Sequence, residues 1–351
     1  MTDLVLLTGI SGFIGGHVGL ELLKQGYAVR GSVRSLSKAD KVRDTLEKAG
    51  ADVSRLEFVA LDLNSDTGWT EAMAGVRYLQ HTASPFVTSA PKDKMELIRP
   101  AVDGTRRALS AALKADVERI VVTSSMAAVY YGHDKSQSER PYGPDVWTNL
   151  QGRHINAYTE SKTLAEREAW TLVDAAGRHD DLAVINPNAV MGPLLDEDPG
   201  TSAALIARMM DGSLPAAARL YFPVIDVRDV AEAHVKAMTS PEAGGHRFPM
   251  GGDTIAFLEF ANIIRRAMPE FGKKLPSYAV PDWVVRTFAA FDADMRANVG
   301  ELGVIRRTDS ADAIKLLGHP LIPVEDAVLA TARSLVAHGI VKPPGTGQKR
   351  G

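Results

Sequence analysis

Short apolar runs alternate with longer amphipathic segments along the first half of the chain. The runs with strand character lie at residues 4–7, 27–33, 56–60, 76–81, 119–125 and 182–187. Between two of them, residues 95–115 repeat apolar side chains near the 3.6-residue spacing of a helix face. Strands that alternate with helices form βαβ units, and the strands of such units run parallel. The pattern therefore predicts an α/β fold with a doubly wound parallel sheet.

A glycine-rich turn follows the first apolar run. The residues from Thr8 to Gly15 read Thr-Gly-Ile-Ser-Gly-Phe-Ile-Gly, and a helical pattern follows them as far as Gln25. Glycines at this spacing allow a tight turn and a close approach of a ligand, and the helix N-terminus suits a pyrophosphate. Glycines also occur in ordinary loops, but the flanking strand and helix favour a dinucleotide site. The candidate contacts are Gly9, Ser11, Gly12, Phe13, Ile14 and Gly15.

A site of this kind predicts two structural units. We expect residues 1–187 and about 221–250 to form a Rossmann-type domain that binds the dinucleotide. Residues from about 188–220 and 251–340 are expected to form a smaller C-terminal substrate-binding lobe. The end of the chain, residues 341–351, is rich in proline and glycine and is predicted to be disordered.

Composition restricts the classes of partner. The 351-residue chain has a formal net charge of −3, and its lack of a block of like charge argues against nucleic-acid and anionic-membrane partners. It contains no run of 18 apolar residues and no signal-peptide pattern, so we expect a soluble cytoplasmic protein. The absence of cysteine excludes disulfides and thiol chemistry, and the nine scattered histidines predict no metal site.

The end of the second predicted strand indicates which dinucleotide binds. A carboxylate there would bind the ribose 2′-hydroxyl of NAD, whereas an arginine accepts the 2′-phosphate of NADP. Arg34 occupies this place, and no Asp or Glu competes nearby. We therefore expect NADP or NADPH. Lys38 is a further candidate phosphate contact, although a solvated helix face is the plainer interpretation for Lys38 and Lys41.

Other candidate cofactor contacts lie where the third and fourth strands end, because ligands of such sheets bind at the carboxyl ends of strands. Asp62 and Leu63 could meet the adenine amino group, and Asp62 could equally cap the next helix. The small residues Thr82, Ala83 and Ser84 are expected beside the ribose and the nicotinamide phosphates. Phe86 is expected to begin the substrate wall.

A second group of candidates combines two distant segments. The fifth strand ends in Thr123-Ser124-Ser125, where a hydroxyl would face a ligand. Tyr158 and Lys162 are four residues apart in a predicted helix, so both lie on one face. A neighbouring ammonium favours the phenolate form of tyrosine and makes its hydroxyl a usable proton donor.

Another Tyr-x-x-x-Lys pattern, from Tyr131 to Lys135, shows that the spacing alone is a weak signal. It contains Gly132 and precedes a polar stretch that reaches Pro141. We predict a loop there, in which positions four apart have no fixed relation. Tyr131 is then a residue of the substrate pocket or of the surface.

Together these stretches resemble the extended short-chain dehydrogenase/reductases. The resemblance lies in residues 8–15, 123–125, 158–166 and 186–193. Within that family, residues 29–34, 81–86 and 161–166 resemble the branch of dihydroflavonol reductases and cinnamoyl-CoA reductases, which includes microbial aldehyde and ketone reductases. The match covers the first two hundred residues well and continues through 224–234, but it covers the last hundred only loosely.

The resemblance implies NADPH-dependent reduction of a carbonyl by a triad of Ser125, Tyr158 and Lys162, with Ser125 preferred to Ser124. Tyr158 and Lys162 would also contact the cofactor, as would Thr123, Pro187 and Val190. The resemblance leaves the oligomeric state open, although a homodimer through the predicted helices 94–115 and 156–177 is common in this fold.

The sequence indicates the substrate class less directly than it indicates the cofactor. Plant flavonoid reductases carry an asparagine five residues after the catalytic serine, and Tyr130 in that place argues against a flavonoid. An aromatic or apolar aldehyde, ketone or β-keto compound fits the expected lining better. That lining comprises Phe86, Met126, Tyr131, Asn188, Val190, Leu194 and Phe222.

Three alternatives remain open. Sugar-nucleotide epimerases and dehydratases share the triad but usually retain NAD, which Arg34 disfavours, and dehydratases need an acidic residue where Met126 stands. A 3β-hydroxysteroid-type dehydrogenase also shares the triad. A non-catalytic redox sensor that binds NADP would be expected to lack the Tyr158–Lys162 pair.

Overall fold

The computed structural model describes residues 3–85, 93–133, 140–289 and 299–344, and the chain divides into two compact units. Unit 1 comprises Met1–Asn188, Arg228–Met250 and Thr308–Pro320. Unit 2 comprises Ala189–Val227, Gly251–Arg307 and Leu321–Gly351. The chain therefore passes between the units several times.

Unit 1 is built on a parallel sheet of seven strands in the order β3-β2-β1-β4-β5-β6-β9. The strands are β1 (Leu4–Thr8), β2 (Ala28–Val33), β3 (Leu56–Ala60), β4 (Tyr78–His81), β5 (Arg119–Thr123), β6 (Leu182–Pro187) and β9 (His246–Met250). The strand order reverses between β1 and β4, and folds of this kind bind ligands at the carboxyl ends of the strands at such a reversal. This arrangement confirms the predicted Rossmann-type doubly wound sheet.

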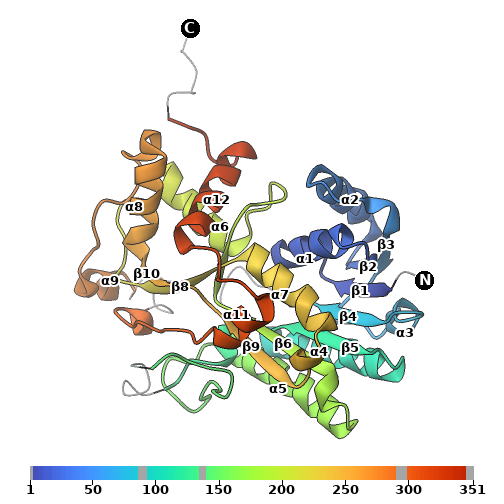
Figure 1. Ribbon diagram of the computed structural model, residues 1–351. Helices are drawn as coiled ribbons and strands as arrows, with labels where there is room; N and C mark the ends of the chain where they lie inside the picture. The colour runs from blue at the N-terminus through green and yellow to red at the C-terminus, as the bar shows by residue number, and fades with distance from the viewer. Residues whose placement is uncertain (1–2, 86–92, 134–139, 290–298, 345–351) are drawn as a thin grey trace. The chain divides into compact units, whose positions relative to one another are not determined.

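Two long helices cover one face of this sheet. These are α4 (Met95–Lys114) and α5 (Ala157–Ala175), which pack against each other (Figure 1). Leu109 of α4 and Val173 of α5 are buried against the strand residues Leu79, Ile120 and Val184. Burial of this apolar stripe explains the helical periodicity of residues 95–115.

Successive strand residues point to opposite faces of the sheet, so Gln80, which follows Leu79, lies on the other face. Gln80 of β4 donates from Nε2 to the backbone oxygen of His234, at 2.9 Å. His234 belongs to α7 (Val227–Thr239), so this bond joins the helix to the sheet. The remaining helices of unit 1 are α1 (Phe13–Lys24), α2 (Ala39–Lys48), α3 (Trp69–Ala72) and α11 (Ala311–Leu317).

Unit 2 has its own small sheet of three strands in the order β10-β8-β7. The strands are β7 (Ala189–Met191), β8 (Tyr221–Asp226) and β10 (Thr254–Ala256). The helices are α6 (Gly200–Asp211), α8 (Phe257–Ala267), α9 (Asp282–Phe288) and α12 (Val324–Ala337). Helix α12 packs on α6, α8 and β8, which gives this unit a separate core.

The expected domain boundaries are wrong in two places. Residues 221–227 belong to unit 2 rather than to the Rossmann-type domain, because β8 pairs with β7 and β10. Residues 308–320 belong to unit 1 rather than to the smaller lobe, because Thr308 bridges to Tyr142 and Lys236 donates to the backbone oxygen of Leu317.

The predicted disordered tail begins too early. Val341 is buried, and its N–H donates to the backbone oxygen of Leu335 at 3.1 Å. The last seven residues, 345–351, lie outside the described residues.

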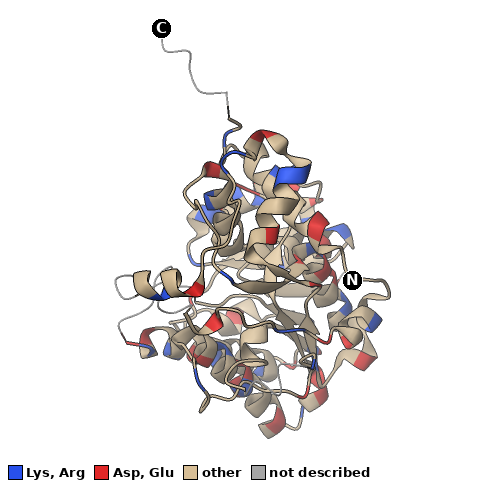
Figure 2. Ribbon diagram, turned by 90° about the vertical axis from the view of Figure 1, so that its left-hand side faces the viewer, with Lys and Arg blue, Asp and Glu red and all other residues tan. Residues whose placement is uncertain are grey.

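Acidic and basic residues are interspersed along the helices that the structure describes (Figure 2). No helix in the described ranges is long and apolar enough to cross a membrane. Among the same residues, no group of three or more His, Cys, Asp or Glu side chains could hold a metal ion.

Candidate active site

The glycine turn between β1 and α1 is closely packed. Gly9 has φ of +74°, and a Cβ atom there would lie 2.8 Å from the Cα atom of Ala83. A Cβ atom at Gly15 would lie 2.1 Å from the backbone oxygen of Gly9. Both positions therefore require glycine, as the sequence predicts. No side chain caps the N-terminus of α1 at Gly12, so its first N–H groups are available to an anion.

Thr8 joins this turn to the end of β4. Its hydroxyl lies 2.8 Å from Nδ1 of His81 and accepts a hydrogen bond from the N–H of Ala83, at 3.2 Å. The hydroxyl of Thr82 donates to the backbone oxygen of Thr8, at 2.6 Å. Burial, with a smaller contribution from the Lys162 ammonium, lowers the pKa of His81 to about 4. His81 is therefore neutral near pH 7, and its bond to Thr8 links the carboxyl ends of β4 and β1.

Tyr158 and Lys162 lie in the first two turns of α5. The side chain of Asn156 caps this helix by accepting the N–H of Thr159, at 2.8 Å. Tyr158 is 42% exposed, so its ring is accessible to a ligand. Lys162 Nζ donates to Ser84 Oγ at 2.9 Å and lies 5.9 Å from the centroid of the Tyr158 ring. The structure thus brings the predicted tyrosine and lysine together with the turn that follows β4.

The two serines after β5 have different surroundings. Ser124 is buried, and its hydroxyl donates to Oε2 of Glu166 at 2.5 Å. Ser125 is partly exposed, and its Oγ accepts the N–H of Ala127 at 3.1 Å as the cap of the short helix η3 (Met126–Ala128). The hydroxyl proton of Ser125 is therefore available to a ligand, whereas that of Ser124 is already used.

Arg34 and Lys38 lie at the predicted cofactor-selective end of β2. Both side chains are exposed, and within the described ranges neither makes a hydrogen bond or ion pair. Ser35 between them caps the turn η1 (Leu36–Lys38) by accepting the N–H of Ser37. An exposed guanidinium at this strand end is suitably placed to bind a phosphate group.

At the end of β3, one of the two interpretations of Asp62 is wrong. Its Oδ1 accepts the N–H of Asn64 at 2.9 Å, whereas α3 begins after Gly68 with no side-chain cap. Asp62 therefore shapes a turn and does not cap the helix. Leu63 is partly buried against Gly104, and the contact of these two residues with adenine stays a prediction.

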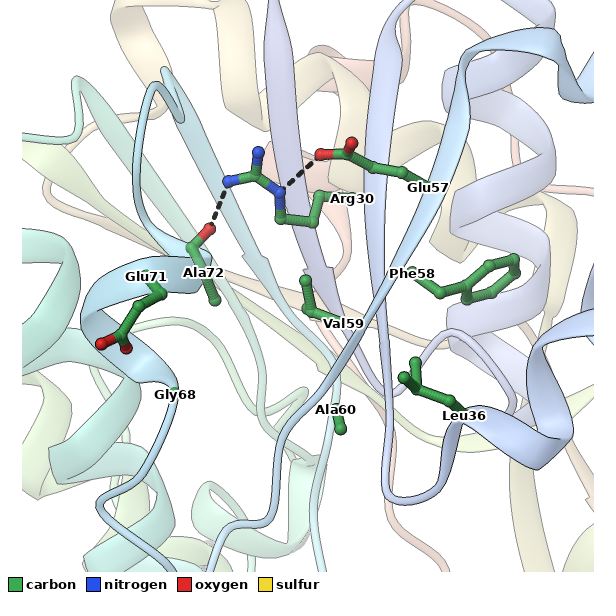
Figure 3. A pocket seen from close by; sticks show the side chains of 9 residues that line it. All are labelled: Arg30, Leu36, Glu57, Phe58, Val59, Ala60, Gly68, Glu71 and Ala72. Carbon is green, nitrogen blue, oxygen red and sulfur yellow. Dashed lines mark hydrogen bonds and ion pairs between the residues drawn. The ribbon is translucent and has the colours of Figure 1, made fainter.

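A pocket lies between β2, β3 and α3 (Figure 3). Arg30 spans it by donating to Oε1 of Glu57 at 2.6 Å and to the backbone oxygen of Ala72 at 2.8 Å. The guanidinium also donates to the oxygen of Ala74, so its charge is paired with Glu57 and its Nε and Nη1 donors are used. Three strands separate β3 from β5, so this pocket is distinct from the Tyr158 site. The lining residues are Arg30, Leu36, Glu57, Phe58, Val59, Ala60, Gly68, Glu71 and Ala72.

The other candidate cofactor contacts have side chains that are hydrogen-bonded or buried within the protein. The hydroxyl of Thr123 lies 2.8 Å from Nε2 of His234, whose Nδ1 lies 2.8 Å from Oε1 of Gln80. The Gln80 carbonyl can only accept, so Nδ1 carries the proton and Nε2 accepts from Thr123. The Thr123 hydroxyl can therefore meet a cofactor only as a hydrogen-bond acceptor. Pro187 is buried at the end of β6, and Val190 is partly buried in β7 of unit 2.

The candidate substrate contacts in unit 1 divide into packing and surface positions. Met126 is fully buried with Val129 and Tyr142, which argues against its predicted contact with substrate. Tyr131 is partly exposed, and its ring centroid lies 4.9 Å from that of Tyr130. Phe86 lies outside the described residues.

Asn188 has a structural role that the sequence does not reveal. Its Nδ2 donates to Oγ1 of Thr308 at 2.6 Å and to the backbone oxygen of Met250 at 3.1 Å. These bonds tie the end of β6 to the segment 308–320 of unit 1. Contact of Asn188 with a substrate stays a prediction.

The remaining candidates belong to unit 2. Leu194 is buried, and its N–H donates to Ser334 Oγ at 3.0 Å. The ring of Phe222 packs edge-on against Phe257 and Phe260, at centroid distances of 5.8 and 6.0 Å. Both side chains contribute to packing within their unit, and their roles toward a substrate stay predictions.

The sequence matches the family described as the NAD dependent epimerase/dehydratase family over residues 5–251. Two curated relatives are each 33% identical to the chain. "Ketoreductase azaE" of Aspergillus niger aligns over 82% of this chain and 89% of its own length. "Cinnamoyl-CoA reductase CAD2" of Medicago truncatula aligns over 80% and 85%.

Solved structures share the fold. The crystal structure of yeast methylglyoxal/isovaleraldehyde reductase Gre2 complexed with NADPH has a TM-score of 0.77 and 24% identity, and the alignment covers 96% of this chain and all of that one. The family match spans the glycine turn, Tyr158 and Lys162. The chain therefore belongs to the NAD dependent epimerase/dehydratase family, the extended short-chain dehydrogenase/reductases.

Proposed function

We propose that the protein is an NADPH-dependent oxidoreductase that reduces a carbonyl group to an alcohol. The observation that carries this proposal is the placement of Lys162 between the exposed Tyr158 ring and Ser84. This arrangement sets a proton donor and a cation beside the strand ends where the fold binds a dinucleotide. Relatives that are named reductases support the same reaction class.

The residues of unit 1 fit the dinucleotide. The space at Gly9 and Gly15 has no room for a Cβ atom, and the uncapped N-terminus of α1 would receive the pyrophosphate. The exposed Arg34 would hold the 2′-phosphate, which favours NADPH over NADH. Ser84 and Lys162 would hold the nicotinamide ribose at the other end of the dinucleotide.

Three side chains would act on the substrate. Bound NADPH supplies a hydride to the carbonyl carbon. Tyr158 donates its hydroxyl proton to the carbonyl oxygen as negative charge develops there, and Ser125 donates a hydrogen bond to the same oxygen. The Lys162 ammonium stabilises the tyrosinate that results.

An aromatic or apolar carbonyl compound is the substrate class that we propose. Tyr130 and Tyr131 lie close after the turn that follows Ser125; both are partly exposed, and their ring centroids are 4.9 Å apart. Aromatic side chains of this kind favour flat or apolar ligands. Tyr130 in the position of the flavonoid-binding asparagine argues against a flavonoid.

A substrate panel tests the proposal. Consumption of NADPH, and then of NADH, is followed by absorbance with aromatic aldehydes, aryl ketones, β-keto esters and a dihydroflavonol. We expect turnover of at least one apolar member with NADPH and much slower turnover with NADH. No turnover of any member by protein that binds NADPH would favour the redox sensor or a 3β-hydroxysteroid-type activity.

A further inference from the structure

A buried ion pair lies beside the serines that follow β5. The Nε atom of Arg247 in β9 donates to Oε1 of Glu166 in α5, at 2.5 Å. The side chain of Glu166 is fully buried, and that of Arg247 is 7% exposed. Glu166 lies one turn beyond Lys162 on the same helix face, which is the signal in the sequence that points to it.

Glu166 connects its helix to the strand end that carries Ser125. Its Oε2 accepts hydrogen bonds from Ser124 Oγ at 2.5 Å and from Asn186 Nδ2 at 2.7 Å. Asn186 Nδ2 also lies 3.4 Å from the backbone oxygen of Ser125. The Glu166 carboxylate thus links α5 to the end of β5 and to β6, beside the proposed triad.

Arg247 holds the other side of the same turn. Its Nη1 donates to the backbone oxygens of Pro144 and Val146, both at 2.7 Å, and its guanidinium carbon lies 3.8 Å from the centroid of the Trp147 ring. Thr148, next in this segment, donates from Oγ1 to the backbone oxygen of Ala127 at 2.7 Å. The segment that Arg247 holds is therefore bonded to the turn that begins at Ser125.

Fold stability alone does not require such a pair. The desolvation of two charges offsets much of their attraction, and apolar residues of similar volume often replace a buried pair without loss of stability. What apolar residues cannot supply is a set of directed bonds to several elements. Here those bonds reach the Ser124 hydroxyl directly and, through Asn186 and Thr148, the backbone oxygens of Ser125 and Ala127.

We propose that Glu166 and Arg247 are positioning residues that fix the Ser125 hydroxyl relative to the Tyr158 hydroxyl. This inference rests on the proposed carbonyl reduction, in which both hydroxyls bind one oxygen atom. Both side chains are buried, so we expect the pair to touch neither substrate nor cofactor. Its loss should therefore lower kcat and leave NADPH binding nearly unchanged.

The variant Glu166→Gln with Arg247→Met tests this, because it removes both charges together and leaves no unpaired buried ion. We expect kcat to fall about 10- to 100-fold, since a misplacement of about 1 Å can cost up to roughly 10²-fold in rate. The Kd for NADPH should change by less than about twofold. A folded double variant with a kcat within about twofold of the wild type would overturn the proposal.

The matched control is Glu168→Gln with Arg106→Met. These two residues form an ion pair between α5 and α4, at 2.7 Å, with the arginine side chain half exposed. Glu168 is two residues from Glu166, and the substitutions are the same in kind. We expect kcat to equal that of the wild type.

A second variant tests the proposal if the double variant shows no cooperative unfolding and so is not properly folded. Ser124→Ala removes only the hydroxyl that links Glu166 to the strand end, and it should lower kcat about threefold to tenfold. A wild-type kcat in this variant would then overturn the proposal.

Tyr158→Phe, measured in parallel, separates the two claims. If this variant is inactive while the double variant keeps the wild-type kcat, only the positioning role fails. If the wild-type protein reduces no carbonyl compound, the proposed function and the inference fail together.

Discussion

Ser124 and Ser125 show how adjacent identical residues receive different roles. Successive residues of an extended chain point to opposite sides. The Ser124 hydroxyl therefore lies in the core against Glu166, and the Ser125 hydroxyl lies beyond the carboxyl end of β5. The sequence alone does not distinguish the two serines, because the difference lies in the hydrogen-bond partner of Ser124. That partner, Glu166, is 42 residues away from Ser124 along the chain.

The Ser125 hydroxyl is expected to stabilise the charge that develops on the carbonyl oxygen. Ser125→Ala should therefore lower kcat by about 10²- to 10³-fold, the usual effect of removing such a donor. The Kd for NADPH, measured by quenching of protein fluorescence, should stay within about twofold. A Ser125→Ala protein with near-normal kcat would remove this serine from the mechanism.

Arg34 is expected to select the dinucleotide. A charge-assisted bond to the 2′-phosphate contributes about 1.5 to 3 kcal/mol, so Arg34→Ala should raise the Kd for NADPH about 10- to 100-fold. NADH lacks this phosphate and provides the internal control, since its Kd should not change. Equal weakening of both dinucleotides would show that Arg34 acts on the fold and not on the phosphate.

Most of the strands follow directly from the sequence, because buried parallel strands appear as apolar runs. The fifth strand is an instructive exception: apolar and hydroxyl residues predict 119–125, but β5 ends at Thr123. The difference arises because Ser125 caps the turn η3, a local use of a serine side chain that competes with strand pairing. The error therefore falls at the candidate site itself.

His234 links α7 to two strands and makes the packing of this helix sensitive to pH. Burial lowers its pKa to about 3, and that of His81 to about 4, from an ordinary value of 6.5. Below pH 6.5 the two histidines bind protons in the unfolded chain but not in the folded protein. Their contribution to the free energy of unfolding is therefore fully present above this pH and is lost as the pH decreases. Each histidine contributes up to about 1.4 kcal/mol per pH unit.

Urea unfolding between pH 7 and pH 5 tests this expectation. His234→Gln should lower stability at pH 7 but reduce the further loss on acidification by up to about 1.4 kcal/mol per pH unit. The control is His319→Gln, because His319 is partly exposed and its pKa is raised by the Pro320 carbonyl and Glu232. An undiminished loss in His234→Gln would contradict the burial argument.

At the scale of the whole chain, the sequence predicts two units but not where the chain passes between them. The strands β8 and β9 are both short and both contain a proline, yet they join different sheets. Strand partners are set by long-range pairing, which leaves no local signal. The same limit explains why the partnership of Glu166 with Arg247, 81 residues apart, is found only in the structure.

The glycine turn and the Tyr158–Lys162 pair could be predicted because each depends on neighbours in the sequence. A tight turn needs glycine at fixed places, and a helix brings positions four apart to one face. The polar bonds that surround the pair come from separate elements. Lys162 donates to Ser84, 78 residues before it in the chain.

The most direct test of the central claim is the turnover of Tyr158→Phe beside the wild type on the best carbonyl substrate of the panel. Loss of the proton donor should reduce kcat by about 10²-fold or more, while the Kd for NADPH changes by less than about twofold. A variant that reduces the carbonyl at a rate comparable with the wild type would contradict the assignment of Tyr158 and the mechanism built on it.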